Sequence, residues 1–205
     1  MKTLLFKESV ELSVFIIVLM IICKNYNIVF ISCLLSLCVL IYLFRVPKRE
    51  MSNLDASYIL APCDGTILSI EESTNDMIKI SIQIHITNVH TQWYPIDGVV
   101  RKTIYKKGSL SMTDFFSKSE KNEKITTLIQ HENGIVRLDQ IAGKFGQRIV
   151  NWSKQNSYIK RGQLMGMIKF SSQVDMFLPS YKVNLLLNEN DNVIGKITPI
   201  AKWVL

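Results

Sequence analysis

The sequence predicts an α+β protein with a mainly antiparallel β domain behind an N-terminal helical membrane anchor. Two observations predict this class. Residues 12–23 and 28–44 are almost entirely apolar, whereas the chain beyond residue 50 breaks into short runs rich in Val, Ile and Thr, as strands prefer. A chain of 205 residues suits one compact domain with a small extra segment. We therefore expect the anchor at residues 1–46 and the β-rich domain at residues 47–205.

The anchor contains two apolar runs separated by KNYN. The second run is about long enough to span a bilayer core and the first is short, so a tight helical hairpin and a single span behind an interfacial helix both fit. A cleaved signal peptide fits less well, because no small-residue cleavage site is present and a second apolar run follows. Arg45, Lys48 and Arg49 come next. This basic cluster predicts a cell-membrane protein whose β domain is on the cytoplasmic side.

The composition favours lipid as the partner. The formal net charge is +7 and the hydrophobic content is 48%, which suits an anionic surface. No Arg-rich tract or zinc-finger spacing is present, so we expect a membrane partner and no nucleic acid. The four cysteines form no CxxC pair. This argues against a disulfide framework and fits a reducing compartment.

The domain divides into strand-like segments separated by turns. HENG lies between two of them and predicts a hairpin, and NENDN separates the last two. The polar stretch 112–124 predicts a loop or a short helix. The expected strands are residues 77–84, 98–108, 125–130, 135–141, 165–170, 174–179, 181–187 and 193–200.

Four islands of sequence carry the residues whose side chains could take part in a reaction. Each of these residues also has a plain structural explanation. Asp64 before Gly65 is an ordinary turn pair, a lone His90 is more often structural than catalytic, and Ser171–Ser172 between two strands suits a turn. Composition and spacing alone therefore identify no enzyme. The islands are FRVPKRE with APCDGTI (44–50 and 61–67), TNVHTQWYPIDG (87–98), IAGKFGQRIVNW (141–152) and KRGQLMGMIKFSSQVDMFLP (160–179).

The order of these islands resembles the short, prokaryotic-type phosphatidylserine decarboxylases, over residues 40–203. LFRVPKR and APCDG resemble that family's FFRxPxR-like and APADG-like phrases. ISIQIHITNVHTQWYPIDG matches an ISIFLSPFDVHVNRAPVDG-like segment without a gap. IAGKFGQRIVNW resembles an IAGxxARRIVxW-like phrase, and GQLMGMIKFSSQVDMFLP resembles the phrase in which that family processes itself, GxxFGMIRFGSRVDVYLP.

The resemblance implies a self-cleaving proenzyme. By position, Asp64, His90 and Ser172 match a protease-like set in which His90 takes the hydroxyl proton of Ser172 and Asp64 orients His90. The Ser172 oxygen then attacks the carbonyl of Ser171. Cleavage between Ser171 and Ser172 leaves a covalent pyruvoyl group derived from Ser172, and no metal is involved.

The implied function is decarboxylation of phosphatidylserine to phosphatidylethanolamine in phospholipid biosynthesis. The pyruvoyl ketone accepts the electrons released as carbon dioxide leaves, much as pyridoxal phosphate does. The implied partners are a phospholipid substrate in the membrane and the two cleaved fragments as a heterodimer, with a homo-oligomer as a family-level expectation. A serine-headgroup ether lipid fits the same chemistry.

Several residues depart from that family's pattern. Ser171 replaces Gly and Gln173 replaces Arg beside the reactive serine, Asn88 replaces Asp, and Trp93 replaces Arg and is expected at the lipid interface. These changes motivate a second hypothesis, a non-catalytic membrane-anchored relative that binds anionic lipid or a protein partner.

A third hypothesis, a metal hydrolase using two histidines, is disfavoured. His85 and His90 are five residues apart, so strand alternation puts them on opposite faces. His131, the remaining histidine, lies in a predicted turn.

Overall fold

The computed structural model describes residues 9–73, 76–108, 122–143, 149–169 and 172–204. The chain divides into two compact units, Met1–Lys48 and Arg49–Leu205. Ser171 and most of the stretch 112–124 lie outside the described residues, so the predictions made for them are not addressed by the fold.

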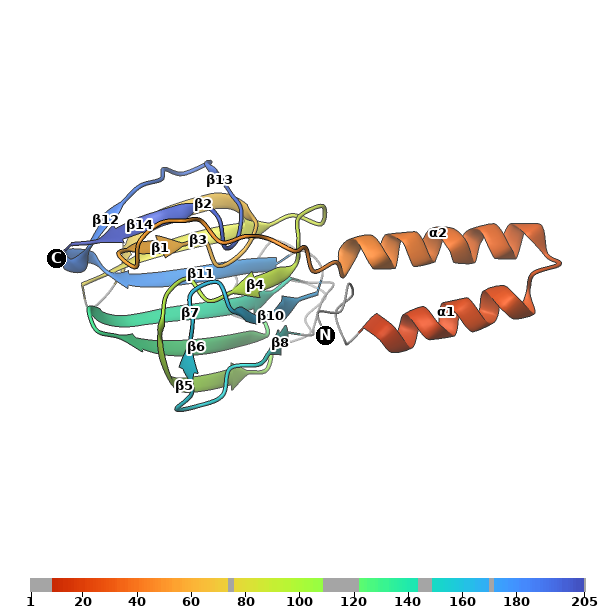
Figure 1. Cartoon of the computed structure of the whole chain (residues 1–205), viewed down its shortest axis with the longest axis horizontal. Coiled ribbons are helices and arrows are strands. Elements are labelled where there is room, and N and C mark those ends of the chain that lie inside the picture. Colours follow the sequence, from red (N-terminus) through yellow and green to blue (C-terminus); the bar gives the residue numbers. More distant parts are fainter. Residues whose placement is uncertain (1–8, 74–75, 109–121, 144–148, 170–171, 205) are drawn as a thin grey trace. The chain divides into compact units, whose positions relative to one another are not determined.

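The first unit is a pair of helices, α1 (Val10–Ile22) and α2 (Asn27–Leu43). They run side by side in opposite directions, which is one of the two arrangements that the sequence leaves open (Figure 1). Large apolar side chains are exposed on both helices, among them Phe15, Ile22 and Ile28. Within the described residues, no helix is both long enough and apolar enough to cross a membrane.

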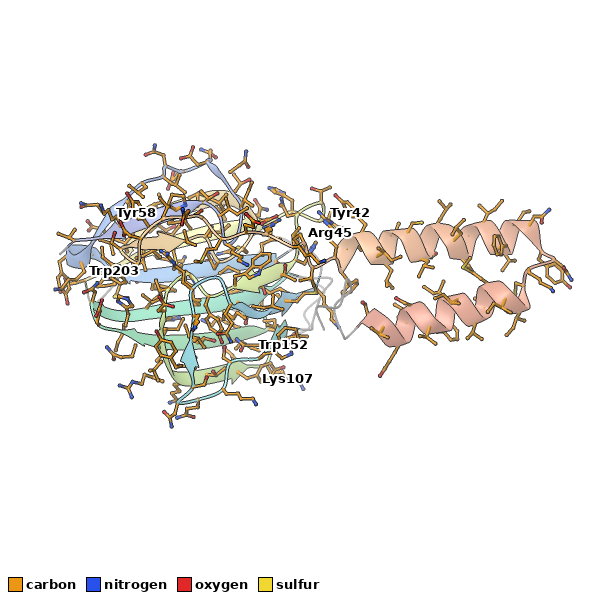
Figure 2. All side chains as sticks on the ribbon, in the orientation of Figure 1. Tyr42, Arg45, Tyr58, Lys107, Trp152 and Trp203 are labelled. Atoms are coloured by element: carbon orange, nitrogen blue, oxygen red, sulfur yellow. The ribbon has the colours of Figure 1, made fainter. Side chains whose placement is uncertain are left out.

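The basic residue that follows α2 is held against the helix end. The Arg45 guanidinium lies 3.9 Å from the centroid of the Tyr42 ring and donates to the Tyr42 carbonyl oxygen at 2.5 Å (Figure 2). A cation near the last carbonyls of a helix is favourable, because these carbonyls carry the negative end of the helix dipole.

The second unit is built on an eight-stranded sheet in the order β13-β2-β3-β11-β7-β6-β5-β9 (Figure 1). Every pair of neighbours in it is antiparallel, as predicted. The strands are β2 (Gly65–Ser73), β3 (Met77–Ile84), β5 (Gly98–Lys106), β6 (Lys124–His131), β7 (Gly134–Ala142), β9 (Tyr158–Ile159), β11 (Ser172–Pro179) and β13 (Asn192–Val193).

Two three-stranded antiparallel sheets complete the domain. One has the order β1-β14-β12 and the other β4-β10-β8. A short 3-10 turn at Ser180–Lys182 joins β11 to β12. The strands are β1 (Tyr58–Leu60), β14 (Pro199–Trp203), β12 (Val183–Leu185), β4 (Thr91–Trp93), β10 (Leu164–Ile168) and β8 (Ile149–Asn151).

Alternation along the central strands separates a core face from a polar face. On β11, Val174, Met176 and Leu178 are buried in the main apolar cluster. Gln173 and Asp175 alternate with them, so they lie on the opposite face. Ser172 has the same parity as the core residues, and this places its side chain on the core face at the start of the strand.

Most predicted strands are present. β3 spans the predicted residues 77–84, and β6 and β7 meet as a hairpin with His131 opposite Gly134, so the HENG turn is confirmed.

The prediction of one strand over residues 193–200 is wrong. β13 ends at Val193 and pairs with β2, whereas β14 begins at Pro199 and pairs with β1 and β12. The chain turns between them, because the N–H groups of Ile197 and Thr198 both donate to the Ile194 carbonyl, at 3.1 and 2.9 Å. Gly195 lies in this turn, and a Cβ there would lie 2.7 Å from the Trp93 ring. Lys196 also has φ of 70°, which no strand residue adopts.

Candidate active site

Ser172 opens β11 at the centre of the large sheet. Its backbone is opposite Ile84 of β3 on one side and Ala142 of β7 on the other. The side chain is buried, with the residue 6% exposed, and Oγ has no hydrogen-bond partner among the described residues. A buried hydroxyl normally has a partner. An unsatisfied one, at the position predicted to react, fits a group that is held for chemistry.

A cleft of about 160 Å³ opens at this end of β11. Side-chain amides and apolar groups both contribute to its wall, and two of its residues come from β11 itself. Its lining residues are Leu68, Gln83, Asn122, Ile141, Ala142, Gly143, Ser172 and Gln173. The cleft therefore gives a small polar group access to the start of the strand that carries Ser172.

His90 lies directly before β4 and is 2% exposed. Its carbonyl oxygen accepts a hydrogen bond from the Ile168 N–H at 3.2 Å, and the next residue, Thr91, is opposite Met167 of β10. Ile168 ends β10, four residues before Ser172. The fold thus attaches His90 to the segment that leads into the predicted cleavage point, although the two are far apart in sequence.

Asp64 is buried in the loop between β1 and β2 and has a strong set of partners. Arg49 donates to both carboxylate oxygens, to Oδ2 at 2.7 Å, and the Gly195 N–H donates to Oδ1 at 2.8 Å. Arg49 thereby neutralises a charge that burial would otherwise penalise. The predicted action of Asp64 on His90 stays a prediction.

β4 connects the surroundings of His90 to those of Asp64. At one end His90 contacts β10, and at the other the Trp93 N–H donates to the Pro62 carbonyl at 2.8 Å, two residues before Asp64. The Arg49 guanidinium lies 5.0 Å from the centroid of the Trp93 ring. Three segments distant in sequence therefore meet along a three-residue strand.

The lipid-interface expectation for Trp93 is wrong. Trp93 is 4% exposed and packs beneath Arg49 and against Gly195. The ring therefore belongs to the packed interior of the domain.

The Asn88 substitution leaves the local turn intact. The Asn88 side-chain oxygen accepts the His85 N–H at 2.8 Å, and the Asn88 N–H donates to the His85 carbonyl at 2.9 Å. An aspartate makes the same turn contact, so the change removes charge and keeps the geometry. Gln173, which replaces arginine, donates to Asp175 at 2.5 Å.

Among the described residues, no group of three or more His, Cys, Asp or Glu is placed to hold a metal ion. His85 is exposed whereas His90 is buried, so the two histidines face different surroundings.

Burial, followed by the charge of Asp64, raises the pKa of the Cys63 thiol well above its ordinary value. Cys63 is therefore a neutral core residue.

Sequence reasoning assigned no role to two parts of this region. Arg49 lay within the island FRVPKRE, yet only its place after the anchor was used. Gln92, Gln140 and Asn151 form a chain of amides, buried at the two glutamines, that ends on the His90 carbonyl. The signal for Gln140 was its position: alternation along β7 assigns it to the core, where a polar residue is unusual.

Comparison with known proteins assigns the class. The phosphatidylserine decarboxylase family profile matches residues 38–198. A phosphatidylserine decarboxylase proenzyme of Parabacteroides distasonis is 35% identical over 184 residues, 86% of this chain and 83% of that protein. A protein of Methanosarcina mazei, provisionally named archaetidylserine decarboxylase proenzyme, is 36% identical over 163 residues, covering 80% and 74%.

A third relative, the phosphatidylserine decarboxylase proenzyme of Carboxydothermus hydrogenoformans, is 33% identical over 168 residues, 79% of this chain and 78% of that protein. The fold and the matches together define a decarboxylase of the proenzyme type. The chain belongs to the phosphatidylserine decarboxylase family, whose members depend on a pyruvoyl group.

Proposed function

We propose that this chain is a self-processing decarboxylase that converts phosphatidylserine to phosphatidylethanolamine in phospholipid biosynthesis. The observation that carries the proposal is the Ser172 hydroxyl, which is buried beside the cleft and unsatisfied among the described residues. It stands in the phrase that resembles the family's processing point, and relatives over most of the chain are named proenzymes.

The first reaction cleaves the chain. His90 takes the Ser172 hydroxyl proton, and the oxygen attacks the Ser171 carbonyl carbon. A carbon–oxygen ester bond forms as the peptide carbon–nitrogen bond breaks, and the nitrogen gains a proton. Loss of the α-proton then expels the Ser171 carboxylate. Water releases the nitrogen as ammonia, leaving a pyruvoyl cap on the fragment that begins at position 172.

The surroundings of Ser172 fit that cap. Once formed, the pyruvoyl group supplies an electron sink for decarboxylation. Gln83, Asn122 and Gln173 line the cleft, and their side-chain amides offer donors for the anionic groups of a serine headgroup. His90 is also the candidate donor of the proton that replaces carbon dioxide.

The proposal includes a membrane location with the β domain on the cytoplasmic side. Two observations support it: α1 and α2 expose apolar side chains around their surfaces, as helices do in lipid, and a basic cluster follows α2.

Substitution of the reactive serine tests the proposal. The full chain and its Ser172→Ala variant are expressed in membranes and assayed for chain cleavage and for carbon dioxide release from phosphatidylserine. We expect cleavage and turnover in the parent chain and neither in the variant. An uncut, inactive parent chain would support the non-catalytic relative instead. A parallel assay with a serine-headgroup ether lipid identifies the lipid class.

A further inference from the structure

We infer that Gln92, Gln140 and Asn151 are positioning residues, which hold His90 in register with Ser172 through a chain of side-chain amides. The inference rests on the proposed function, because it concerns the base of the self-cleavage reaction. The three residues come from β4, β7 and β8, so the chain links the large sheet to the three-stranded sheet that carries His90 at its edge.

The hydrogen bonds run in one direction. Asn151 Nδ2 donates to Gln140 Oε1 at 2.7 Å, Gln140 Nε2 donates to Gln92 Oε1 at 2.9 Å, and Gln92 Nε2 donates to the His90 carbonyl oxygen at 2.7 Å. Asn151 Nδ2 also donates to Thr127 Oγ1 at 3.0 Å. Each amide along the chain therefore acts as both donor and acceptor.

Backbone groups at both ends fix this polarity. At one end the Ser153 N–H, which can only donate, points at Asn151 Oδ1 at 2.7 Å. At the other end the His90 carbonyl can only accept. If any one amide were turned over, two acceptors or two donors would face each other. The chain thus has a single satisfied arrangement.

Burial makes that arrangement costly to disturb. Gln92 is 1% exposed, Gln140 is 0% exposed, and the terminal Thr127 is 0% exposed. A buried amide left without a partner costs about 1–3 kcal/mol, whereas an apolar side chain of similar size carries no such penalty. Fold stability alone therefore gives no reason for glutamines in these two positions.

Gln140 also ties the chain to the reactive serine. It lies on β7, two residues before Ala142, and Ala142 is opposite Ser172 in the ladder between β7 and β11. The same strand therefore holds the Ser172 backbone by its ladder and the His90 backbone through two amides. The His90 carbonyl also accepts a hydrogen bond from the Ile168 N–H of β10. This bond ties His90 to the strand that leads toward Ser172.

The test follows self-cleavage of the full chain, made by cell-free synthesis in the presence of phosphatidylglycerol vesicles, as loss of the uncut band with time. The variants are Gln140→Met and Gln92→Met, which keep side-chain length and remove the hydrogen bonds. We expect each to slow cleavage by about 10- to 100-fold, because a misplacement of about 1 Å costs that much in rate. Thermal unfolding reports whether each variant is folded.

The matched control is Gln130→Met. Gln130 likewise donates its side-chain N–H to a backbone carbonyl, that of His131 at 2.9 Å, but at the opposite end of β6 from the cleft. We expect this variant to cleave at the parental rate.

The pH profile of a Gln140→Glu variant separates positioning from general stability and decides the question if the methionine variants do not fold. A protonated glutamic acid at this position accepts from Asn151 and donates to Gln92, whereas the ionised form cannot donate. The cleavage rate of this variant, divided by the parental rate at the same pH, should therefore be highest at low pH and fall as the carboxyl ionises, with a pKa raised by burial. The parent chain should show no such loss.

The outcomes are distinct. Parental rates in both methionine variants, equal slowing in the Gln130→Met control, or a Gln140→Glu profile identical to that of the parent would each overturn the inference and leave the proposed function standing. An uncut parent chain would overturn the proposed function and this inference together.

Discussion

At the scale of single residues, the partners of Asp64 define how the candidate site is held. Arg49 and the Gly195 N–H occupy its carboxylate, and Arg49 also contacts the Gly195 carbonyl at 3.1 Å. A carboxylate and a guanidinium in this geometry form two parallel charge-assisted hydrogen bonds, which fix orientation as well as charge. Arg49 is thus a positioning residue for Asp64.

Removal of Arg49 should therefore weaken both the fold and the reaction. We expect Arg49→Gln to lower the free energy of unfolding by about 1–3 kcal/mol, because a charged hydrogen-bond partner of a largely buried carboxylate is lost, and to slow self-cleavage. Urea unfolding and the cleavage time course measure the two effects. Arg101→Gln, a change at an exposed position, is the control. Equal behaviour of the two variants would refute this role.

Asp139 gives a prediction for pH. Burial alone would raise its pKa, but hydrogen bonds from Arg137 at 2.9 Å and Thr126 at 2.7 Å, together with the charge of Lys124, hold the pKa below its ordinary value of 3.8. The unfolded chain then binds the proton more readily than the folded chain, so this group stabilises the fold above pH 3.8 and its contribution is lost as the pH falls below that value.

Unfolding experiments across the acid range test the sign. The free energy of unfolding of the parent chain should fall with decreasing pH, and Asp139→Asn should flatten that dependence. Glu132→Gln, an exposed change in the HENG turn, should leave it unaltered. A dependence equally steep in the Asp139→Asn variant would show that other groups control acid stability.

The sequence indicated the candidate reacting residues but not what holds them. Asp64, His90 and Ser172 stood in phrases that resemble a known family. The contacts that support them join residues far apart in the chain: Arg49 to Gly195 spans 146 positions, and Gln92 to Gln140 spans 48. Pattern and propensity are local properties, so neither of these pairs could be predicted from them.

At the scale of elements, β11 is the strand on which the candidate site depends. All eight of its residues face β3, and six of them also face β7. The predicted cleavage point lies directly before this strand. Cutting there alters only the first pair of each ladder, at Ser172, and leaves the pairs from Gln173 onward in place, so β11 stays in the middle of the sheet.

The two fragments should therefore remain together after cleavage. We expect them to co-elute in gel filtration in mild detergent and to separate only in denaturant. Tags at each end of the chain allow the co-elution to be followed. Separation of the C-terminal fragment without denaturant would contradict this interpretation of β11.

Elements with a strong local pattern were predicted well, and those set by packing were not. Alternation and a two-residue turn defined β6 and β7, and the alternating segment IKISIQI defined most of β3. Short strands such as β4 and β8 have only three residues each. They form because a neighbour, β10, supplies their hydrogen bonds, and this leaves little trace in their own sequence.

At the scale of the whole molecule, the chain joins an apolar helical pair to a β domain through a basic segment. The proposed orientation puts that domain in the cytoplasm. Tyr181, 70% exposed on the domain surface, is suited to carry a reporter, whereas Cys63 is 0% exposed and shielded from a reagent in solution.

Labelling of a Tyr181→Cys variant tests the orientation. Cys23, Cys33 and Cys38 are replaced by alanine in the full chain, and a membrane-impermeant maleimide is added to intact and to opened cells. We expect labelling only in opened cells. The same background without the new cysteine is the control. Labelling of intact cells would place the domain outside.

The chemical identity of the residue at position 172 tests the central claim most directly. Intact mass spectrometry of the purified chain should show two fragments, and the one beginning at position 172 should be lighter by one ammonia than the same fragment with an unmodified serine. Borohydride should then add two hydrogens to it, as it does to a ketone. A single uncut chain, or a fragment with an ordinary serine amino terminus, would contradict the claim.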